Sequence, residues 1–349
     1  MKRIVLLLMT ICLTSLACAT VSNVQTVGDS CSREELNKIT DMYFKSIQAH
    51  STSGLPLAST VKFTENAVIK EVGTGFWESA GKPLLKRTLI DTRKCVTATI
   101  SVIEEPFSSK TVGEGFGSGG APGAPGAPKI PAGVKKPPAG QSGDGNVAAL
   151  FAGPKELPEE GTVRPILFAN RLKVENGKIT EIENIIARER DFAFTVEKEL
   201  ETKDQDWETI LPPEKRIPRK VLADAANHYF DQFMKGSTVS VPYAKVCDRW
   251  ENGFLTTGRD HDCSPVTFIN RRGTSINHGP RRVWVDTEKG ISIAFMMFGG
   301  GATANAENPT GSGLVDCHMF RMRDGKVDLI HAIVGPRAQS MGWPLEPIE

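Results

Sequence analysis

The sequence predicts an α+β protein made of two diverged copies of one domain in tandem. Three observations lead to this prediction: the length of the chain, segments of the first half that recur in the second, and the same order of helix and strands in both halves. At 349 residues the chain is too long for one average domain, and each half is long enough to bury its own core. Apolar residues make up 40% of the chain, which is ordinary for a globular protein.

The first recurring segment is an amphipathic helix, and Tyr43 and Tyr229 hold the same position in its two copies. At the same offset, Glu65-Asn66 recurs as Glu251-Asn252. Apolar residues at helical spacing form one face in each copy: Leu36, Ile39, Tyr43 and Ile47 in the first, and Val221, Ala225, Tyr229 and Phe233 in the second. Each half therefore begins with a helix that packs on a sheet.

The second and third recurring segments are strands. A strand at 86–92 matches 281–287, and the strand after it, at 97–103, matches 292–298. A hairpin with an Asn-Gly turn at 172–179 matches one with an Asp-Gly turn at 320–327, and both dipeptides are strong hairpin signals. Helices on one face of a curved antiparallel sheet make an α+β architecture.

Composition divides the chain further. We expect the first domain at 31–196, with an insertion at 113–145 that is rich in glycine, alanine and proline. Such a stretch buries too little apolar surface to fold, so we expect a flexible loop. A charged, proline-containing linker follows at 197–220, and the second domain spans 221–345.

The N-terminus, residues 1–19, is typical of a signal peptide. Lys2 and Arg3 precede a short apolar run from Ile4 to Leu13, and Ala17-Cys18-Ala19 is a small-x-small cleavage site. A membrane anchor and a lipoprotein are the alternatives; a lipoprotein would carry Leu where Ser15 stands, so we favour simple export, to the periplasm or outside the cell. No other stretch is long and apolar enough to span a membrane.

Export permits disulfides among the five cysteines that remain after cleavage. Cys247 and Cys263 flank a polar loop and are the first candidates for a pair, with Cys31 and Cys95 as a second. That arrangement leaves Cys317 free. No CxxC motif occurs among the five cysteines, so the sequence does not suggest a zinc site.

The segment Cys247-Asp248-Arg249-Trp250-Glu251-Asn252-Gly253, the Asp324-Gly325-Lys326-Val327 turn and the closing Gly342-Trp343 resemble an uncharacterised SnoaL-like family of the nuclear transport factor 2-like superfamily. The resemblance covers most of the second copy and the first copy more loosely, where Ala67 replaces the glycine. It implies two tandem cone-shaped domains, each with a curved sheet wrapped around helices and an apolar pocket. Members include isomerases, dehydratases, cyclases and epoxide hydrolases, and others only bind ligands or partners.

Histidines are the first candidates for chemistry, because all except His50 lie in the second half. His318 and His331 lie on the two strands of the last hairpin and align with Asn170 and Glu183. A histidine that faces an apolar cavity can transfer protons near neutral pH. The alternative is a hydrogen-bonded core histidine. By strand alternation, His318 shares a face with Phe320 and Met322, and His331 shares one with Leu329 and Val327.

Two further residues are candidates for stabilising negative charge. The hydroxyl of Tyr229 can donate to a developing oxyanion, although Tyr43 at the matching position favours a structural role. Arg249 aligns with Phe63, so it is specific to the second copy, and it can pair with Glu251. The run from Asp260 to Cys263 is dense in metal-ligand types, but consecutive residues rarely converge on one ion, so we expect no metal.

These observations favour a cofactor-independent lyase, isomerase or hydrolase acting on a small, partly apolar molecule in the second domain, with His331, His318, Arg249 and Tyr229 as site residues. The alternative is a non-catalytic ligand-binding or pairing module. A formal net charge of +1 and the lack of a nucleic-acid motif exclude nucleic acid as an expected partner. No nucleotide-binding motif is present, so we expect no cofactor. We expect the two domains to pair with each other.

Overall fold

The computed structural model describes residues 31–112, 156–266, 275–302 and 311–345. The predicted signal peptide and the predicted insertion at 113–145 lie outside these residues. Within them, no helix is long and apolar enough to cross a membrane.

The first domain is a six-stranded sheet in the order β2-β1-β6-β5-β4-β3. Its elements are α1 (Arg33–Gln48), β1 (Leu57–Glu65), β2 (Val68–Lys70), the short 3-10 helix η1 (Gly75–Glu78), β3 (Pro83–Asp91), β4 (Val96–Pro106), β5 (Val163–Glu175) and β6 (Lys178–Ala187). Ser32 caps α1, because its hydroxyl accepts from the backbone N–H of Glu35 at 3.1 Å.

The second domain repeats this plan with the order β8-β7-β12-β11-β10-β9. Its elements are α3 (Arg219–Asp231), β7 (Tyr243–Glu251), β8 (Phe254–Leu255), β9 (Arg282–Asp286), β10 (Ile291–Phe298), β11 (Gly313–Arg323) and β12 (Lys326–Ala338). The helix α2 (Val196–Glu201) and the short helix η3 (Pro213–Lys215) lie between the two domains in the chain.

The strand register confirms the tandem repeat pair by pair. Thr99 faces Asn170 across β4 and β5, and Ala294 faces His318 across β10 and β11. In the same way Phe63 lies beside Ile182 in the first sheet, while Arg249 lies beside Ile330 in the second, which are the pairs that the sequence alignment requires. The two copies therefore share one sheet topology, and equivalent positions can be compared directly.

Each domain consists mostly of β-strands. Its sheet is mixed, rather than antiparallel as we expected. The strand after each long helix, β1 or β7, pairs in parallel with the last strand, β6 or β12. Hairpin turns in a sequence reveal only antiparallel neighbours, and no turn joins these two strands. The parallel edge therefore has no local signal.

The apolar face of the second helix also differs from the expected one. Val221 is 39% exposed, whereas Leu222 and Ala226 are fully buried beside Tyr229. Ala225 and Tyr229 are buried as expected, so only Val221 was wrong, and Leu222 takes its place on the buried face. Phe233 is buried beyond the end of α3, which stops at Asp231.

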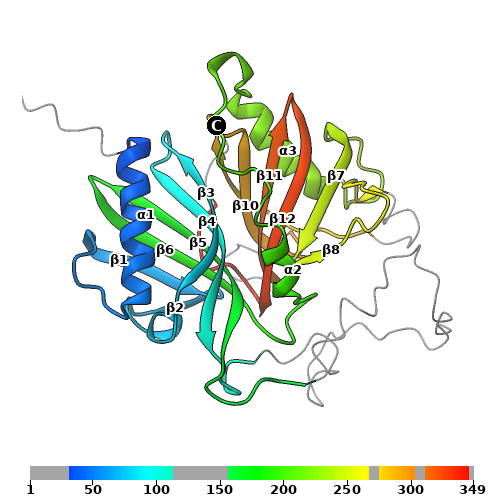
Figure 1. The fold of residues 1–349 in the computed structure, drawn as a ribbon. Coiled ribbons are helices and arrows are strands. Elements are labelled where there is room, and N and C mark those ends of the chain that lie inside the picture. The colour runs from blue at the N-terminus through cyan, green and yellow to red at the C-terminus, as the bar shows by residue number, and fades with distance from the viewer. Residues whose placement is uncertain (1–30, 113–155, 267–274, 303–310, 346–349) are drawn as a thin grey trace, which may run out of the picture.

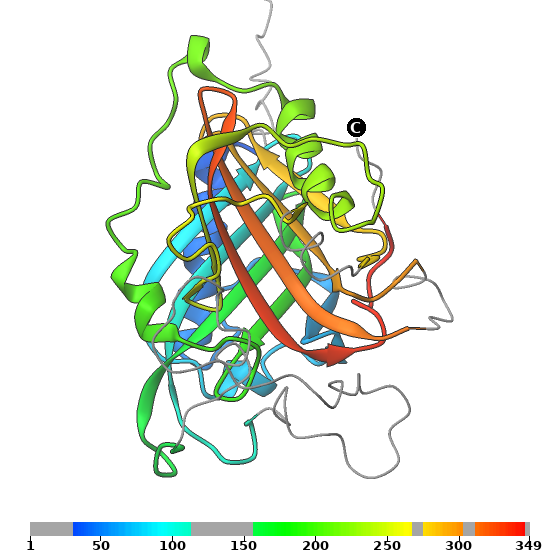
Figure 2. The same cartoon turned by 90° about the vertical axis from the view of Figure 1, so that its right-hand side faces the viewer.

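The four layers of the molecule follow from its three main cores (Figures 1 and 2). α1 covers the outer face of the first sheet, and α3 covers the outer face of the second. The inner faces of both sheets contribute to one shared core, for example Ile100 and Leu167 from the first and Phe295 and Met319 from the second. Trp343 belongs to this core and donates from its indole nitrogen to Thr64 of the first domain at 2.9 Å.

Both predicted disulfides are present. Cys247 joins Cys263 between β7 and the loop that follows β8, and Cys31 joins Cys95 between the start of α1 and the β3–β4 turn. Cys317 is a buried free cysteine in the core that the two sheets share. Each disulfide ties an element of one domain to its own sheet.

Two equivalent aspartates make reciprocal contacts across the two domains. Asp91 accepts from the backbone N–H of Val285 at 3.1 Å and pairs with Arg219 at 2.7 Å. Asp286 makes the corresponding contacts, which are to Ile90 N–H at 3.1 Å and to Arg33 at 2.5 Å. Each aspartate also accepts from backbone N–H groups of its own turn. When two equivalent residues make the same contact in opposite directions across an interface, the interface is isologous.

We predict that Asp286→Ala destabilises the protein by about 3 kcal/mol, because it leaves the buried Ile90 N–H without its acceptor and Arg33 with Glu288 as its remaining carboxylate partner. Equilibrium unfolding in urea measures the change. Asp41→Ala is the matched control, since Asp41 also pairs with a cation, Lys86, but is 60% exposed in its side chain. Its cost should be below about 1 kcal/mol. Equal losses in the two variants would contradict the interface role of Asp286.

Candidate functional site

A connected group of polar side chains lies on the α3 side of the second sheet. We call it the Tyr229 cluster, and its members are Tyr229, Arg249, Glu251, His318 and Asp316. α3 supplies Tyr229, β7 supplies Arg249 and Glu251, and β11 supplies the other two. Residues two apart on a strand share a face, so each strand directs its pair toward the helix.

Arg249 links the helix to the strand. Its Nη1 donates to the Tyr229 hydroxyl oxygen at 2.9 Å, and its Nε donates to Thr256 Oγ1 at 2.8 Å. Glu251 Oε1 lies 3.5 Å from Arg249 Nε. Because the tyrosine oxygen accepts from Arg249, its own proton is left to donate elsewhere.

His318 lies at the centre of the buried end of the cluster. Its Nδ1 is 2.9 Å from Asp316 Oδ1, and its Nε2 is 3.7 Å from Glu251 Oε1. The second distance is too long for a hydrogen bond. His318 Nε2 and Asp316 Oδ2 are both buried without a hydrogen-bond partner among the described residues.

The charges in the cluster are strongly coupled. Burial alone would lower the pKa of His318, but Asp316 and Glu251 outweigh it and raise that pKa to about 9. Burial raises the pKa of Asp316. Burial would also raise the pKa of Glu251, but Arg249 and His318 together lower it. At neutral pH His318 is therefore an imidazolium held at Nδ1 by Asp316, with its second N–H unpaired.

Aromatic rings surround this group. Tyr229 and His318 are both 0% exposed, and their ring centroids lie 5.6 Å apart. Phe230 approaches His318 edge-on at 5.0 Å, and Phe320 approaches Tyr229 at 5.2 Å. The side chains of Arg249 and Glu251 retain 13% and 10% exposure, so the cluster reaches solvent at β7.

Of the five equivalent positions in the first domain, only Tyr43 and Glu65 carry a titratable side chain. Tyr43 donates to Asn184 Oδ1 at 3.0 Å, and Asn170, the counterpart of His318, donates to the same oxygen at 2.8 Å. Phe63 replaces Arg249 and Phe168 replaces Asp316. The remaining counterpart, Glu65, accepts from the backbone of Phe76, the start of a segment that fills this interior with aromatic rings.

His331 lies on the opposite face of the second sheet, in contact with the first domain. Arg87 of β3 donates to its Nδ1 at 3.0 Å, Glu199 Oε1 lies 2.7 Å from the same atom, and its Nε2 lies 2.8 Å from Gln205 Oε1. Burial and the charge of Arg87 outweigh Glu199 and lower the pKa of His331. The structure thus brings together His318, Arg249 and Tyr229 but separates His331 from them.

A register shift explains part of this outcome. β12 contains an extra residue between the partners of Arg321 and Met322, namely Asp328. As a result Leu329 faces the core between the sheets and Val327 faces α3, although alternation predicted one face for both. His331 shares its face with Leu329 and not with Val327.

Sequence reasoning missed Asp316 and did not include Glu251 among the site residues. Asp316 had a signal, because it stands two residues before His318 on a strand and its counterpart Phe168 is apolar. Asn252, the neighbour of Glu251, is structural: its side chain bonds both the N–H and the C=O of Val334 at 2.8 and 2.7 Å. Asn66 bonds Ile186 in the same way in the first domain.

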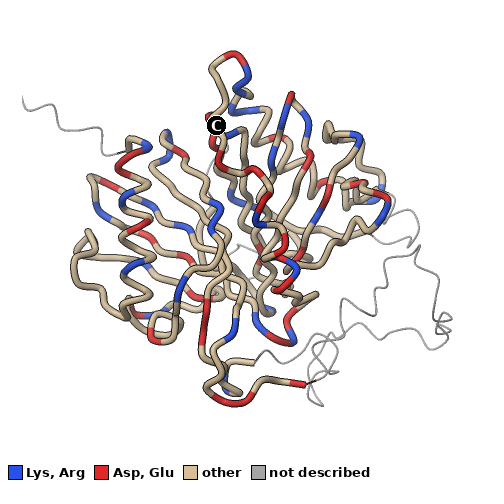
Figure 3. Tube along the Cα trace, in the orientation of Figure 1, with Lys and Arg blue, Asp and Glu red and all other residues tan. Residues whose placement is uncertain are grey.

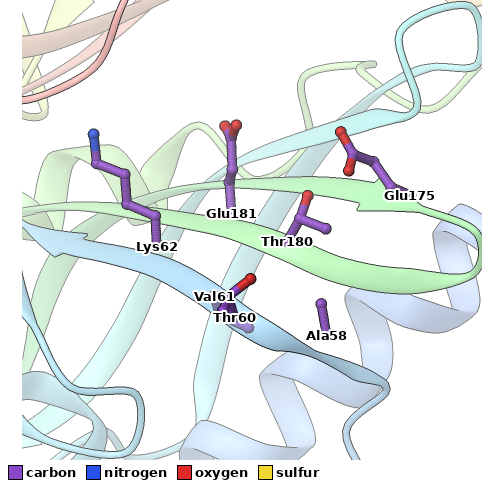
Figure 4. Close-up of a pocket in the computed structure, with 7 residues that line it drawn as sticks. All are labelled: Ala58, Thr60, Val61, Lys62, Glu175, Thr180 and Glu181. Carbon is purple, nitrogen blue, oxygen red and sulfur yellow. The ribbon is translucent and has the colours of Figure 1, made fainter.

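A hollow of about 450 Å³ lies elsewhere, on the first domain (Figure 4). It is open, and β1, β6 and the end of β5 line it with Ala58, Thr60, Val61, Lys62, Glu175, Thr180 and Glu181. Lys62 already lies over the ring of Trp343, with its Nζ 4.2 Å from the ring centroid. The hollow contains no member of the Tyr229 cluster.

Charges and metal-ligand types give no further site. Acidic and basic positions are interspersed along the trace (Figure 3). No three His, Cys, Asp or Glu side chains of the described residues converge as a metal site would require. In the run from Asp260 to Cys263, His261 pairs with Asp248 at 2.6 Å, and Cys263 is in a disulfide.

Residues 215–334 match the model of a family described as a domain of unknown function (DUF8021). The matched segment covers most of the second domain, including every member of the Tyr229 cluster, and none of the first. Comparison with curated proteins gives no match.

Proposed function

We propose that the protein is a cofactor-independent enzyme of proton transfer, a lyase, isomerase or hydrolase, whose site is the Tyr229 cluster. The observation that supports it is the contrast between equivalent positions of the two copies. His318, Asp316 and Arg249 replace Asn170, Phe168 and Phe63, so three positions that hold ionisable side chains in the second copy hold none in the first. Burying such groups is costly, and clusters of this kind are enriched at functional sites.

The roles follow from the hydrogen bonds. His318 carries the transferable proton on Nε2, while Asp316 holds Nδ1 and fixes the orientation of the ring. Arg249 donates to the Tyr229 oxygen, which makes the phenol a better donor to an oxyanion that forms on the substrate. Glu251 stays ionised beside Arg249 and His318 and serves as the proton acceptor. The substrate is a small, partly apolar molecule.

We extend the proposal to the fold and the setting of the protein. The repeated helix-and-sheet plan supports two SnoaL-like, cone-shaped domains, and the reciprocal Asp91 and Asp286 contacts support a fused pseudo-dimer. The two disulfides support export through the predicted signal peptide. In this arrangement the first domain, with its aromatic filling, stabilises the second.

A non-catalytic ligand-binding or pairing module is the second candidate. The close packing of aromatic rings around Tyr229 and His318 favours it, because side chains that fill an interior leave little room for a substrate to react there. Both candidate functions place the site in the second domain. They differ in whether the protein transfers a proton to or from the ligand.

A thermal-shift screen with a matched pair of variants tests the proposal. We expect small carbonyl, hydroxyl or epoxide compounds to stabilise the whole protein, and the stabilisation to be lost in Tyr229→Phe and kept in Tyr43→Phe. The two substitutions remove the same atom at equivalent positions of the two domains. Hits that respond equally to both variants would contradict a site in the second domain. Ligands that the protein does not convert, or converts no more slowly when His318 is replaced, would favour the binding module.

A further inference from the structure

His278 is a buried histidine that the proton-transfer scheme above does not use. It lies between the end of β8 and the start of β9, and it is 2% exposed. Its Nδ1 accepts from the backbone N–H of Gly299 at 3.1 Å. An Nδ1 that accepts leaves the proton of a neutral imidazole on Nε2. His278 Nε2 is buried without a hydrogen-bond partner among the described residues.

His278 shares its aromatic surroundings with His318. The ring of Phe298 is 4.3 Å from His278 and 6.3 Å from His318, measured between centroids. Phe230 lies 5.6 Å from His278 and 5.0 Å from His318. The two imidazoles therefore border the same apolar interior, and each has one unpaired nitrogen there.

The backbone around His278 is held by its own hydrogen bonds. Ile276 N–H donates to Phe233 C=O at 3.0 Å, and Gly301 N–H donates to Asn277 C=O at 3.0 Å. These bonds tie the segment to the end of α3 on one side and to the end of β10 on the other. Nothing in this arrangement uses Nε2, so its burial is not required to position the segment.

An unpaired buried N–H is destabilising, and native structures contain few of them. Burial also lowers the pKa of His278 well below its usual value, so the ring is neutral and the Nε2 proton is retained at physiological pH. A neutral donor in an apolar interior is suited to a hydrogen bond with an acceptor oxygen of a ligand. It is not suited to moving a proton near neutral pH.

We infer that His278 is a substrate-binding residue that donates its Nε2 proton to a carbonyl or carboxylate oxygen on a ring-sized apolar compound. The inference rests on the proposed function for the place of the site. Two donors there have no hydrogen-bond acceptor among the described residues: Nε2 of His278, and Nε2 of His318, which lies 3.7 Å from Glu251 Oε1. The unpartnered acceptor beside them is Asp316 Oδ2. A ligand that completes these bonds must therefore supply acceptor oxygens, and the phenylalanine rings favour a flat apolar body.

Nitrogen-15 NMR of the histidine rings in the whole protein tests this inference with three probes. Acetophenone carries a neutral carbonyl oxygen, benzoate carries a carboxylate, and toluene carries neither. We expect acetophenone or benzoate to shift the Nε2 resonances of both His278 and His318, and toluene to shift neither. A response to acetophenone alone identifies the oxygen as a carbonyl, and a response to benzoate alone identifies it as a carboxylate.

Two variants sharpen the test. His278→Asn retains an oxygen that can accept from Gly299 N–H but loses the Nε2 donor, so the probe that binds should bind about tenfold more weakly. His50→Asn is the control, because His50 bonds Ala80 C=O in the first domain, and it should leave binding unchanged. The wild-type titration decides the question even if His278→Asn does not fold.

The outcomes separate the inference from the proposed function. Shifts at His318 without shifts at His278 would overturn the role of His278 and leave the proposed site standing. Shifts at neither histidine with any probe would count against both. Binding that is undiminished in His278→Asn would also overturn the inference.

Discussion

Replacing Glu183 with alanine is expected to destabilise the protein by about 3–5 kcal/mol, because it removes the carboxylate that pairs with buried Arg282 and leaves buried Arg171 with Glu181 alone. Glu183 accepts from Arg171 Nε at 2.8 Å and from both terminal nitrogens of Arg282 at 2.8 and 2.6 Å. All three side chains are 2% exposed or less. Arg171 belongs to the first domain and Arg282 to the second, so the loss also weakens the contact between them. Equilibrium denaturation measures the change.

The pH dependence of this variant follows from the same contacts. Burial would raise the pKa of Glu183, but Arg282 and Arg171 outweigh it and lower the pKa. A lowered folded pKa means that the stabilisation is fully present above the unfolded value of about 4.3 and is lost as the pH falls through the folded value. Glu183→Ala should therefore flatten the acid limb of the stability curve. Glu175→Ala is the control, because the side chain that it removes is 54% exposed. It should neither destabilise the protein strongly nor flatten the acid limb. A cost below 1 kcal/mol for Glu183→Ala would contradict the structural role.

Glu183 also shows what alignment of the copies cannot reveal. The sequence places it opposite His331, and the structure confirms that both lie on the last strand of their sheets and face the core between the domains. The sequence offered His331 as a proton-transfer group, because alternation gives which residues share a face but not which face meets the other domain. That choice depends on contacts with Arg87 and Glu199, which are distant in sequence.

Local signals succeeded where the interaction itself is local. Asn176-Gly177 and Asp324-Gly325 form the predicted turns with positive φ at both residues, because left-handed backbone suits these types. The cysteine pairs and the repeat were likewise readable from spacing. The parallel pairing of the first strand with the last has no such signal. The extra residue Asp328 has none either, although it decides which face Val327 takes.

The Tyr229 cluster was predictable from the sequence only in part. His318 and Arg249 were identified from the sequence because their counterparts are not ionisable. Tyr229 was identified because its hydroxyl can donate to an oxyanion, although its repeat at Tyr43 favoured a structural role. Asp316 was identifiable by the same comparison, since a carboxylate replaces Phe168. The position of Glu251 between Arg249 and His318 was not identifiable from the sequence. Its counterpart in the first domain is also a glutamate, Glu65, which accepts a hydrogen bond from the backbone.

Replacing His318 with asparagine should lower turnover of a substrate of the second domain on the order of a hundredfold or more, because asparagine cannot transfer a proton near neutral pH. The substitution gives the second domain the residue that the first domain has at this place, Asn170, which is accommodated in an equivalent strand pair. Steady-state kinetics on a compound from the ligand screen measures the loss. His50→Asn, in the first domain, should retain turnover.

The pH profile separates proton transfer from a merely structural effect. Asp316 and Glu251 raise the pKa of His318 to about 9 against the opposing effect of burial, so the wild-type acid form is present at neutral pH and is lost as pH rises through that value. Turnover should therefore fall on the alkaline side, and His318→Asn should lack this limb. The same raised pKa means that His318 stabilises the fold fully below about 6.5, its unfolded value, and that this contribution disappears as pH rises through about 9. An alkaline limb of activity that persists in His318→Asn would assign the proton to another group, because the only change between the two proteins is the imidazole that Asp316 orients.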